Sequence, residues 1–486
     1  MRHHTVGQRM RPIVAGLMAF GLVAAACSSD KGETTATEPV ASEPVATEAP
    51  AEEPAEEPAE EPAEEPAEEP AEEPAEEPAS DSPAAVVLAA MGLDGNEELG
   101  AGATWNIGAT LSFSGPGGFA AELEKNGIEL AIEHIAAAGG PEIVVEYGDN
   151  ATGGDPEAAA NANTNLGEKG IGVKLSDFAD GLGAGFPTLA QYEILTLDAA
   201  AGTGTGPGVG FDLYWGPRAL TPFDGFPGVM GYVAATNPDA TSMAVLSNDA
   251  GPANDFNAAY FEAQGASAGL ELGFIELIPF TAQDFSASIA KLQAEQPDII
   301  VLDLHFGTEG GFFRQAINAG IDPSTIYSTE LTGFSAVTSQ GAFDEAPFVY
   351  AGDYAPEAQD NPLMNMVAAE YEATYGAPID DQAARYYQAT LLLWELYMRT
   401  LANGGDVDSG PDLQASLIED PTFVTLWGGS ADSTETFSFD LDKHWVDSYP
   451  LAVYSLEGGV NTLIATYDIS IDADGARTAD NFELAS

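Results

Sequence analysis

The sequence predicts an α/β fold with two lobes, and two observations support this prediction. From residue 104 onward, short apolar runs alternate with helical patterns, which is typical of parallel strands joined by helices. About 385 of the 486 residues follow a low-complexity N-terminal segment, and this length is enough for two lobes that each bury a core. The hydrophobic content of 45% is ordinary for a folded protein.

Residues 1–27 have the composition of a signal peptide. Three arginines precede an apolar run over residues 13–26, which is too short to span a bilayer as a helix. The run ends at Cys27, the only cysteine of the chain, so no disulfide is expected. A lone cysteine after small residues resembles a bacterial lipobox, although Ala24 stands where that pattern prefers leucine. We therefore expect a lipid anchor at Cys27 on the extracytoplasmic face of the cell membrane; the alternative is a secreted protein.

Residues 28–103 are predicted to be a disordered tether and spacer. Seven copies of Ala-Glu-Glu-Pro occupy residues 51–78. Proline at every fourth position removes helical donors and the glutamates repel one another, so the segment should be extended. We interpret it as a stalk that holds the folded part away from a membrane, the alternative being a tolerated repeat expansion. The apolar stretch 84–93 is a candidate short helix.

The charge of the chain excludes one class of partner. There are 78 acidic and 14 basic residues, a net charge of −64. Such a field repels nucleic acid, so no nucleic-acid partner is expected. The acidity fits a high-salt environment, in which repulsion is screened, and it equally fits an ordinary acidic exported protein.

The first α/β unit is predicted over residues 106–147. An apolar strand at 106–111 is followed by a loop at 112–118 that contains serine, glycine and proline. A helical pattern over 123–138 and a second strand at 142–147 complete a βαβ unit. A loop at the carboxyl end of a strand is where open α/β sheets bind ligands.

The later elements continue this alternation. Helices are expected over 156–166, 186–192, 223–235, 254–268, 284–294, 310–319, 361–375 and 380–402, and strands over 172–175, 194–197, 243–246, 271–278, 298–304, 326–329, 451–456 and 463–469. Crossings between the lobes are expected near 213–222, 349–354 and 437–441.

Several strings carry a resemblance to one family. LSFSGPGGF, AIEHIAAAGG, VVEYGDN and DPEAAANANTNL open the folded part, and QDFSASIAKLQAEQPDIIVLD follows later. Their order and spacing resemble the type I periplasmic solute-binding proteins of ABC importers, in the leucine/isoleucine/valine-binding (branched-chain amino acid) group, over about residues 104–450. The resemblance implies two Rossmann-like lobes joined by a three-segment hinge. Lobe 1 would comprise 104–216 plus 355–436, and lobe 2 would comprise 217–354 plus 437–486.

The resemblance also implies a ligand held between the lobes by strand-end loops. The candidate ligand-binding residues are Ser112, Ser114, Asp177, Asp180, Gly181, Ala201 and Thr203 in lobe 1, and Asn248, Asp249, His305, Phe306 and Glu330 in lobe 2. Glu330 stands where the family has the acid that receives the ligand's ammonium group.

Asp177 and Asp180 depart from the family, which has serine and threonine in that loop. A ligand carboxylate would be repelled there, so we expect a cationic or neutral polar ligand such as an amide or polyamine. The alternative is that both are helix-capping or solvated acids.

No catalytic, cofactor or metal motif is recognisable. The chain lacks G-x-S-x-G and H-E-x-x-H, and residues 472–475 lack the ligand spacing of a calcium loop. We therefore expect a monomeric binding lipoprotein, not an enzyme, that delivers a small polar solute (an amino acid, an amide or a related amine) to the permease subunits of an ABC importer. A receptor of the same fold that signals to a membrane partner without transport is the alternative.

Overall fold

The computed structural model describes most of the chain after the tether. The described residues are 82–93, 98–152, 155, 157–178, 184–200, 211–218, 222–249, 254–331, 343–353, 360–430, 433–446, 450–471 and 477–485. The predicted signal peptide, Cys27 and the Ala-Glu-Glu-Pro repeats lie outside them.

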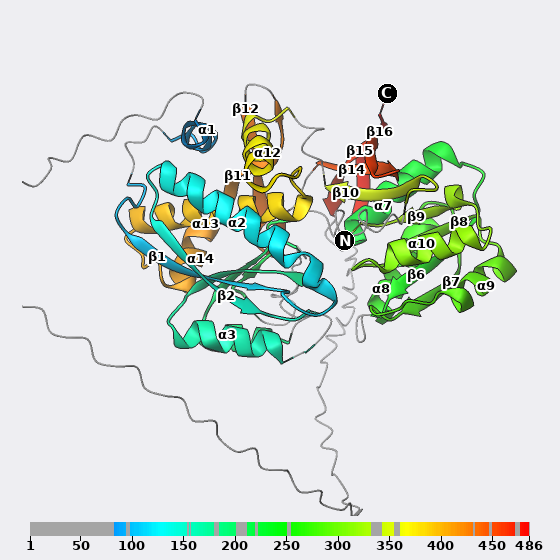
Figure 1. Ribbon diagram of the computed structural model, residues 1–486, viewed down its shortest axis with the longest axis horizontal. Helices are drawn as coiled ribbons and strands as arrows, with labels where there is room; N and C mark the ends of the chain where they lie inside the picture. The colour runs from blue at the N-terminus through cyan, green and yellow to red at the C-terminus, as the bar shows by residue number, and fades with distance from the viewer. Residues whose placement is uncertain are drawn as a thin grey trace, which may run out of the picture. The chain divides into compact units, whose positions relative to one another are not determined.

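The first sheet is parallel and has the strand order β2-β1-β3-β4-β5. Its strands are β1 (Thr104–Leu111), β2 (Glu142–Asp149), β3 (Val173–Ser176), β4 (Leu195–Asp198) and β5 (Tyr214–Trp215). The connecting segments are η1 (Pro116–Phe119), α2 (Ala121–Ala137), α3 (Ala158–Glu168) and α5 (Phe186–Tyr192). Helix α3 lies on one face of the sheet and α2 on the other (Figure 1). All five strands therefore point their carboxyl ends to the same edge.

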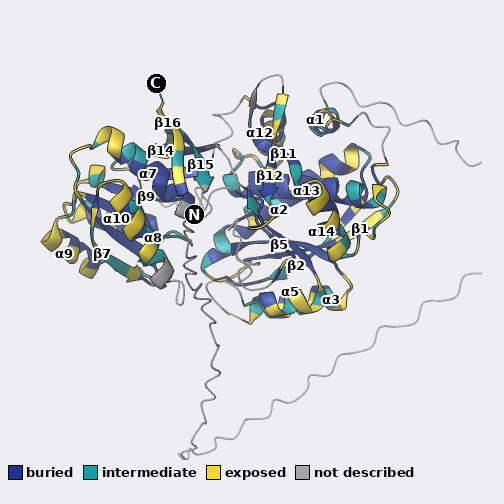
Figure 2. Ribbon diagram, turned by 180° about the vertical axis from the view of Figure 1, so that it is seen from behind, coloured by how far each residue is buried: buried dark blue, intermediate teal, exposed yellow. Residues whose placement is uncertain are grey.

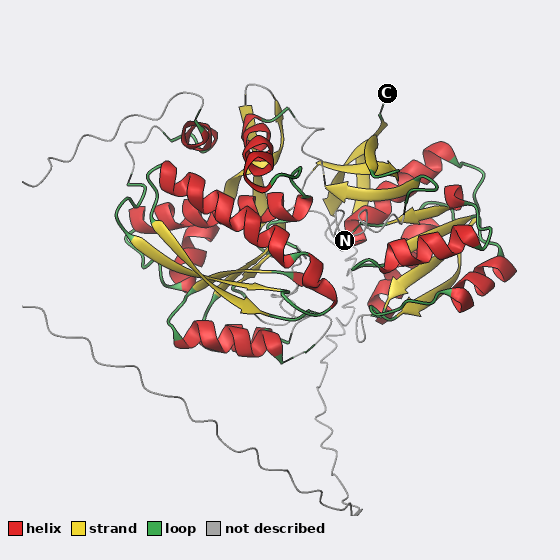
Figure 3. Ribbon diagram, in the orientation of Figure 1, coloured by secondary structure: helices red, strands yellow, loops and turns green. Residues whose placement is uncertain are grey.

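The second sheet has eight strands in the order β16-β15-β14-β10-β9-β8-β6-β7. The parallel part contains β6 (Ser242–Asn248), β7 (Glu271–Ile278), β8 (Ile299–Asp303), β9 (Ile326–Ser328) and β10 (Phe348–Asp353). The antiparallel edge contains β14 (Pro450–Glu457), β15 (Val460–Ile471) and β16 (Arg477–Leu484). The helical segments are α7 (Pro222–Thr236), α8 (Asn254–Ser267), α9 (Ser286–Glu295), α10 (Thr308–Asn318) and η3 (Pro323–Thr325). The alternation of helices and strands in both sheets (Figure 3) confirms the predicted α/β class with two lobes.

The chain returns to the first sheet after β10. The returning helices are α12 (Pro362–Tyr375), α13 (Asp381–Ala402) and α14 (Gly410–Glu419), and the candidate helix near the start of the folded part is α1 (Pro83–Ala90). A small sheet β11-β12-β13 follows, with β11 (Thr422–Ser430), β12 (Ser433–Asp440) and β13 (Trp445–Val446). The expected third crossing at 437–441 falls in β12, which pairs with β11 and β13 instead. The second sheet is entered only after Val446, because β14 is the strand that pairs with β10.

Helix α13 is the central helix of the first lobe and is buried along nearly all of its length (Figure 2). Asp380 caps its start by accepting a hydrogen bond from the Gln382 backbone N–H at 3.0 Å. The helix packs so closely on α2 that a Cβ added at Gly127 would lie 2.1 Å from the Ala383 carbonyl oxygen. Glycine at this crossing brings the two helix backbones together.

The segment that follows β5 is held in place by contacts with His444. The Trp215 indole stacks on the His444 ring with centroids 3.6 Å apart, and the Gly216 N–H donates to the His444 carbonyl at 2.9 Å. Two segments that lie far apart in the sequence are thus held together where the chain leaves the first sheet. Within the described part of the chain, no helix has the length and apolar character needed to cross a membrane.

Candidate functional site

A buried polar network joins the carboxyl ends of three strands in the first sheet. The Ser112 N–H donates to Asp177 Oδ2 at 2.7 Å, and the Ser112 hydroxyl donates to Asn150 Oδ1 at 2.8 Å. The Asn150 amide in turn donates to Asp177 Oδ1. All three side chains are inaccessible to solvent. The structure therefore brings the predicted residues Ser112 and Asp177 together through Asn150, which was not among the predicted residues.

Ser114 has a different environment. Its hydroxyl donates to Asp149 Oδ2 at 2.6 Å, and its N–H donates to Asp149 Oδ1 at 3.2 Å. The residue is exposed. Ser114 therefore shapes the loop after β1 and is not part of the buried network.

Asp177 belongs to a group of buried acids. Burial raises its pKa to about 7, although hydrogen bonds from Asn150 and Ser112 oppose the shift. Burial and the nearby Asp177 raise the pKa of Glu124 on α2 well above its usual range. Asp198, at the end of β4, raises the pKa of both carboxyl groups further. Asp177 is thus not a solvated acid, and near neutral pH this group readily holds protons.

In the second sheet, the ends of β6 and β8 meet through Asn248 and His305. The His305 N–H donates to Asn248 Oδ1 at 2.7 Å, and His305 Nε2 lies 3.2 Å from Asp303 Oδ1. Burial alone would lower the pKa of His305, but the hydrogen bond and charge of Asp303 outweigh it and raise the pKa. Asp249 is exposed and accepts a hydrogen bond from Asn254 at 2.7 Å.

Phe306 links aromatic rings of the two lobes. Its backbone is in the left-handed region, with φ 59°. Its ring centroid lies 5.0 Å from that of Phe178 and 6.0 Å from that of Phe119, both in the first lobe, and 5.4 Å from that of Phe280 in the second. The side chain therefore contributes an apolar contact beside the buried polar groups.

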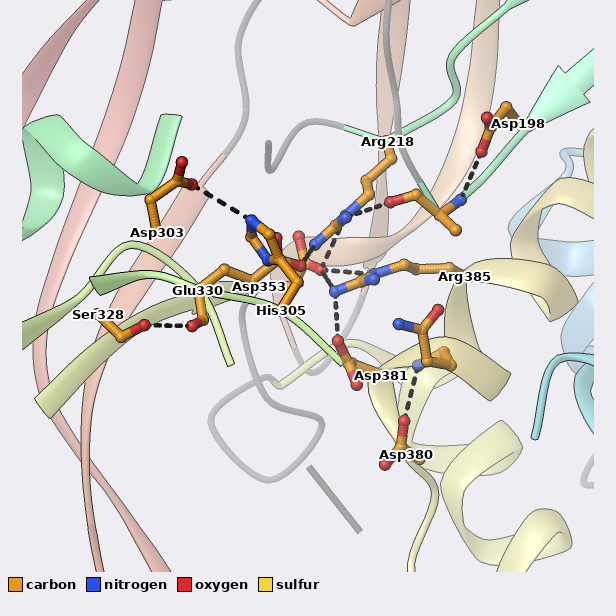
Figure 4. A network of polar contacts seen from close by, with 12 residues as sticks. Asp198, Arg218, Asp303, His305, Ser328, Glu330, Asp353, Asp380, Asp381 and Arg385 are labelled. Atoms are coloured by element: carbon orange, nitrogen blue, oxygen red, sulfur yellow. Dashed lines mark hydrogen bonds and ion pairs between the residues drawn. The ribbon is translucent and has the colours of Figure 1, made fainter. Parts of the chain in front are cut away.

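Two buried arginines connect the lobes (Figure 4). Arg218, which follows β5, pairs with Glu330, which follows β9, and its Nε lies 3.6 Å from Asp353 Oδ2. Arg385, on α13, donates from Nε to Asp353 Oδ2 at 2.6 Å and also pairs with Asp381. The side chains of Arg218, Arg385, Glu330 and Asp353 are all at most 6% exposed. The network thus joins residues of both sheets across the hinge.

The charge state of Glu330 follows from this network. Burial would raise its pKa, but the positive charges of Arg218, His305 and Arg385 lower it below its usual value. Glu330 therefore carries a negative charge at neutral pH, and it is balanced by Arg218.

The remaining predicted residues, Asp180, Gly181, Ala201, Thr203 and Cys27, lie outside the described residues. Five residues of these networks were not among those predicted from the sequence: Glu124, Asn150, Arg218, Asp353 and Arg385. The sequence does contain a feature that could have pointed to Arg385. It lies between two alanines and two tyrosines in residues 383–387, in a chain with only 14 basic residues. In the described ranges, no three His, Cys, Asp or Glu side chains are grouped so that they could hold a metal ion.

Comparisons with known proteins place this geometry in a family. Residues 104–442 match a family model described as periplasmic binding protein. A search of curated proteins gives no match.

Solved structures share the fold. A leucine-binding protein from Thermotoga maritima superposes with a TM-score of 0.61 at 18% identity, over 74% of this chain and 98% of that one. A solute-binding protein of an ABC transporter from R. palustris, in complex with benzoate, gives 0.62 at 17% identity, over 77% and 98%. The branched-chain amino acid transporter substrate-binding protein LivJ from Streptococcus pneumoniae, in complex with isoleucine, gives 0.59 at 20% identity, over 74% and 97%. With its two-lobed α/β fold and a family match over most of its length, the chain belongs to the periplasmic binding protein family.

Proposed function

We propose that this protein is an extracytoplasmic solute-binding lipoprotein. It captures a small polar solute, such as an amino acid, an amide or a related amine, between its lobes and delivers it to the permease subunits of an ABC importer. The observation that carries the proposal is the buried cluster of hydrogen-bonding and charged groups where the strand ends of both sheets meet, with Arg218 and Glu330 joined across the hinge. Ligand closure of two such lobes is a hinge motion. The solved structures of the same fold that are described as binding leucine, benzoate or isoleucine support the assignment.

The charges of the cluster favour a neutral or cationic solute. Asp177, Glu124 and Asp198 are buried together, whereas Arg218 and Arg385 already pair with carboxylates. A solute that offers only a carboxylate would find both arginines already paired with carboxylates, and it has no N–H to donate to the buried acids. An amide or an amine has N–H groups that can donate to these acids.

A thermal-shift screen tests the binding role. Amino acids, carboxamides and polyamines are added singly to the folded part of the chain at millimolar concentration. A true ligand at 100 times its Kd stabilises the protein by about 2.7 kcal/mol and raises the melting temperature by several degrees. Glu330→Gln should weaken binding of the best compound at least several-fold, whereas Asp298→Asn, at an exposed residue before β8, should change it little. If no compound raises the melting temperature, the proposal is wrong.

The lipid anchor is tested separately through Cys27. The single cysteine follows an apolar segment and precedes a long acidic tether, so the thiol is the expected attachment point. We expect the wild-type protein in the membrane fraction of expressing cells and Cys27→Ser in the medium or periplasm. Equal fractionation of both proteins would exclude the anchor without affecting the binding role.

A further inference from the structure

The first turn of α13 contains buried polar atoms that have no hydrogen-bond partner. Gln382 is 1% exposed, yet neither its Nε2 nor its Oε1 is hydrogen-bonded to any described residue. The same is true of Arg385 Nη1, although the other guanidinium nitrogens of that residue pair with Asp353 and Asp381. Residues at i and i+3 lie on the same face of a helix. Donors and an acceptor are therefore unsatisfied at one place, and such groups are costly to bury.

Glu124 faces the same turn from α2. Gly127, one turn further along α2, lies against the Ala383 carbonyl, so the helix crossing brings Glu124 beside the start of α13. The residue is fully buried, and no donor among the described residues reaches either carboxylate oxygen. Burial and the neighbouring Asp177 raise the pKa of Glu124, and both of its oxygens remain available to a group of the solute.

Gln388, two turns further along α13, is a buried glutamine of the same helix whose side chain is hydrogen-bonded within the protein. It is also buried, at 2% exposed. Its Oε1 accepts from the Thr425 hydroxyl at 2.7 Å and from the Leu426 N–H at 2.9 Å. The side-chain amide of Gln388 is therefore hydrogen-bonded within the protein, whereas that of Gln382 is not.

The position of this turn links it to the hinge. The Tyr386 hydroxyl donates to the Ser176 carbonyl at the end of β3, at 2.6 Å. Arg385 pairs with Asp353 at the end of β10 in the other sheet. The unsatisfied atoms therefore lie next to the strand ends that carry the candidate site.

We propose that Gln382, Arg385 and Glu124 form a subsite that binds the carboxamide or ureido group of the solute. This deepens the proposed function and rests on it. The solute's N–H groups donate to the Gln382 and Glu124 oxygens. Its carbonyl oxygen accepts from Arg385 Nη1 and from the Gln382 amide nitrogen. A carboxylate has no N–H to donate and faces Glu124, Asp177 and Asp381, whereas an ammonium group has no acceptor for Arg385.

Matched pairs of compounds test the chemical class. The folded part of the chain is titrated in thermal-shift and calorimetric experiments with glutamine and glutamate, asparagine and aspartate, acetamide and acetate, and nicotinamide and nicotinate, together with putrescine and leucine. At least one carboxamide should bind, and at least ten times more tightly than its carboxylate. If only carboxylates, putrescine or leucine bind, this subsite is refuted and the binding role stands. If nothing binds, both proposals fail.

Three substitutions at two glutamines test the residues. Gln382→Leu should weaken binding of the best carboxamide about ten-fold or more and should not lower the melting temperature of the protein alone, because it removes unsatisfied polar atoms. Gln388→Leu should show the opposite result, with a melting temperature several degrees lower and an unchanged Kd, because it leaves the Leu426 N–H and the Thr425 hydroxyl without an acceptor. The subsite is refuted if Gln382→Leu leaves the Kd unchanged, or if it lowers the melting temperature as much as Gln388→Leu does. Gln382→Glu, which keeps the shape and removes a donor, should also weaken binding and distinguishes hydrogen bonding from packing.

Discussion

Replacing Arg385 with methionine is expected to lower the free energy of unfolding by about 3–5 kcal/mol, the usual cost of removing one partner from a buried ion pair. Arg385 is 3% exposed and neutralises Asp353 and Asp381. Methionine fills a similar volume but leaves Asp381 without its ion-pair partner. Arg218 Nε, at 3.6 Å, remains near Asp353. The measurement is urea-induced unfolding followed by circular dichroism.

Two control variants test whether the loss of stability comes from the buried ion pair. Lys125→Met removes an ion pair whose side chains are 33% and 46% exposed, and such a pair contributes less than about 0.5 kcal/mol. Adding Asp381→Asn to Arg385→Met removes the uncompensated charge and should recover part of the loss. A loss of less than about 1 kcal/mol for Arg385→Met, or no recovery in the double variant, would contradict this account.

Much of the fold could be predicted because the elements are locally encoded. The helix expected over 380–402 is α13 (Asp381–Ala402), and the strand expected over 271–278 is β7 (Glu271–Ile278). Both have long, regular patterns that set their limits. The small sheet β11-β12-β13 was not predicted. Its last strand is only two residues long, and antiparallel pairing depends on partners that a local pattern does not contain.

The site was predictable to a smaller extent. Strand ends are visible in the sequence, so Ser112, Asp177 and Asn248 could be selected from the rule that ligands bind at carboxyl ends of parallel strands. That rule could not select Glu124 and Arg385, which are on helices. They meet the site through the crossing of α2 and α13, which depends on the close contact of Gly127 with Ala383. Side chains brought together by helix packing have no fixed spacing in the sequence.

The pH dependence of stability should distinguish Asp177 from an ordinary surface acid. Its pKa is raised from 3.8 to about 7, chiefly by burial. Between these two values the folded state holds a proton that the unfolded state has released, so the contribution of Asp177 to stability falls as the pH rises from about 4 to 7. Asp177→Asn removes this contribution. The difference in unfolding free energy between variant and wild type should therefore change by about 3–4 kcal/mol in favour of the variant between pH 4 and pH 8, at 1.36 kcal/mol per pKa unit.

The change with pH, and not the absolute stability, is the diagnostic quantity. Asparagine keeps an acceptor for the Ser112 N–H but loses the bond from Asn150, which shifts the whole curve by a constant amount. Asp298 provides a control of opposite sign. It is exposed, and its pKa is lowered by hydrogen bonds from Thr241 and Ser242, so Asp298→Asn should cost more stability at pH 8 than at pH 3. Urea unfolding at pH 4, 5, 6, 7 and 8 measures the Asp177 difference, with pH 3 added for the Asp298 control. A difference for Asp177→Asn that stays constant over its range would show that this carboxylate is already ionised at pH 4, and the buried acidic group would then need another source of compensating charge.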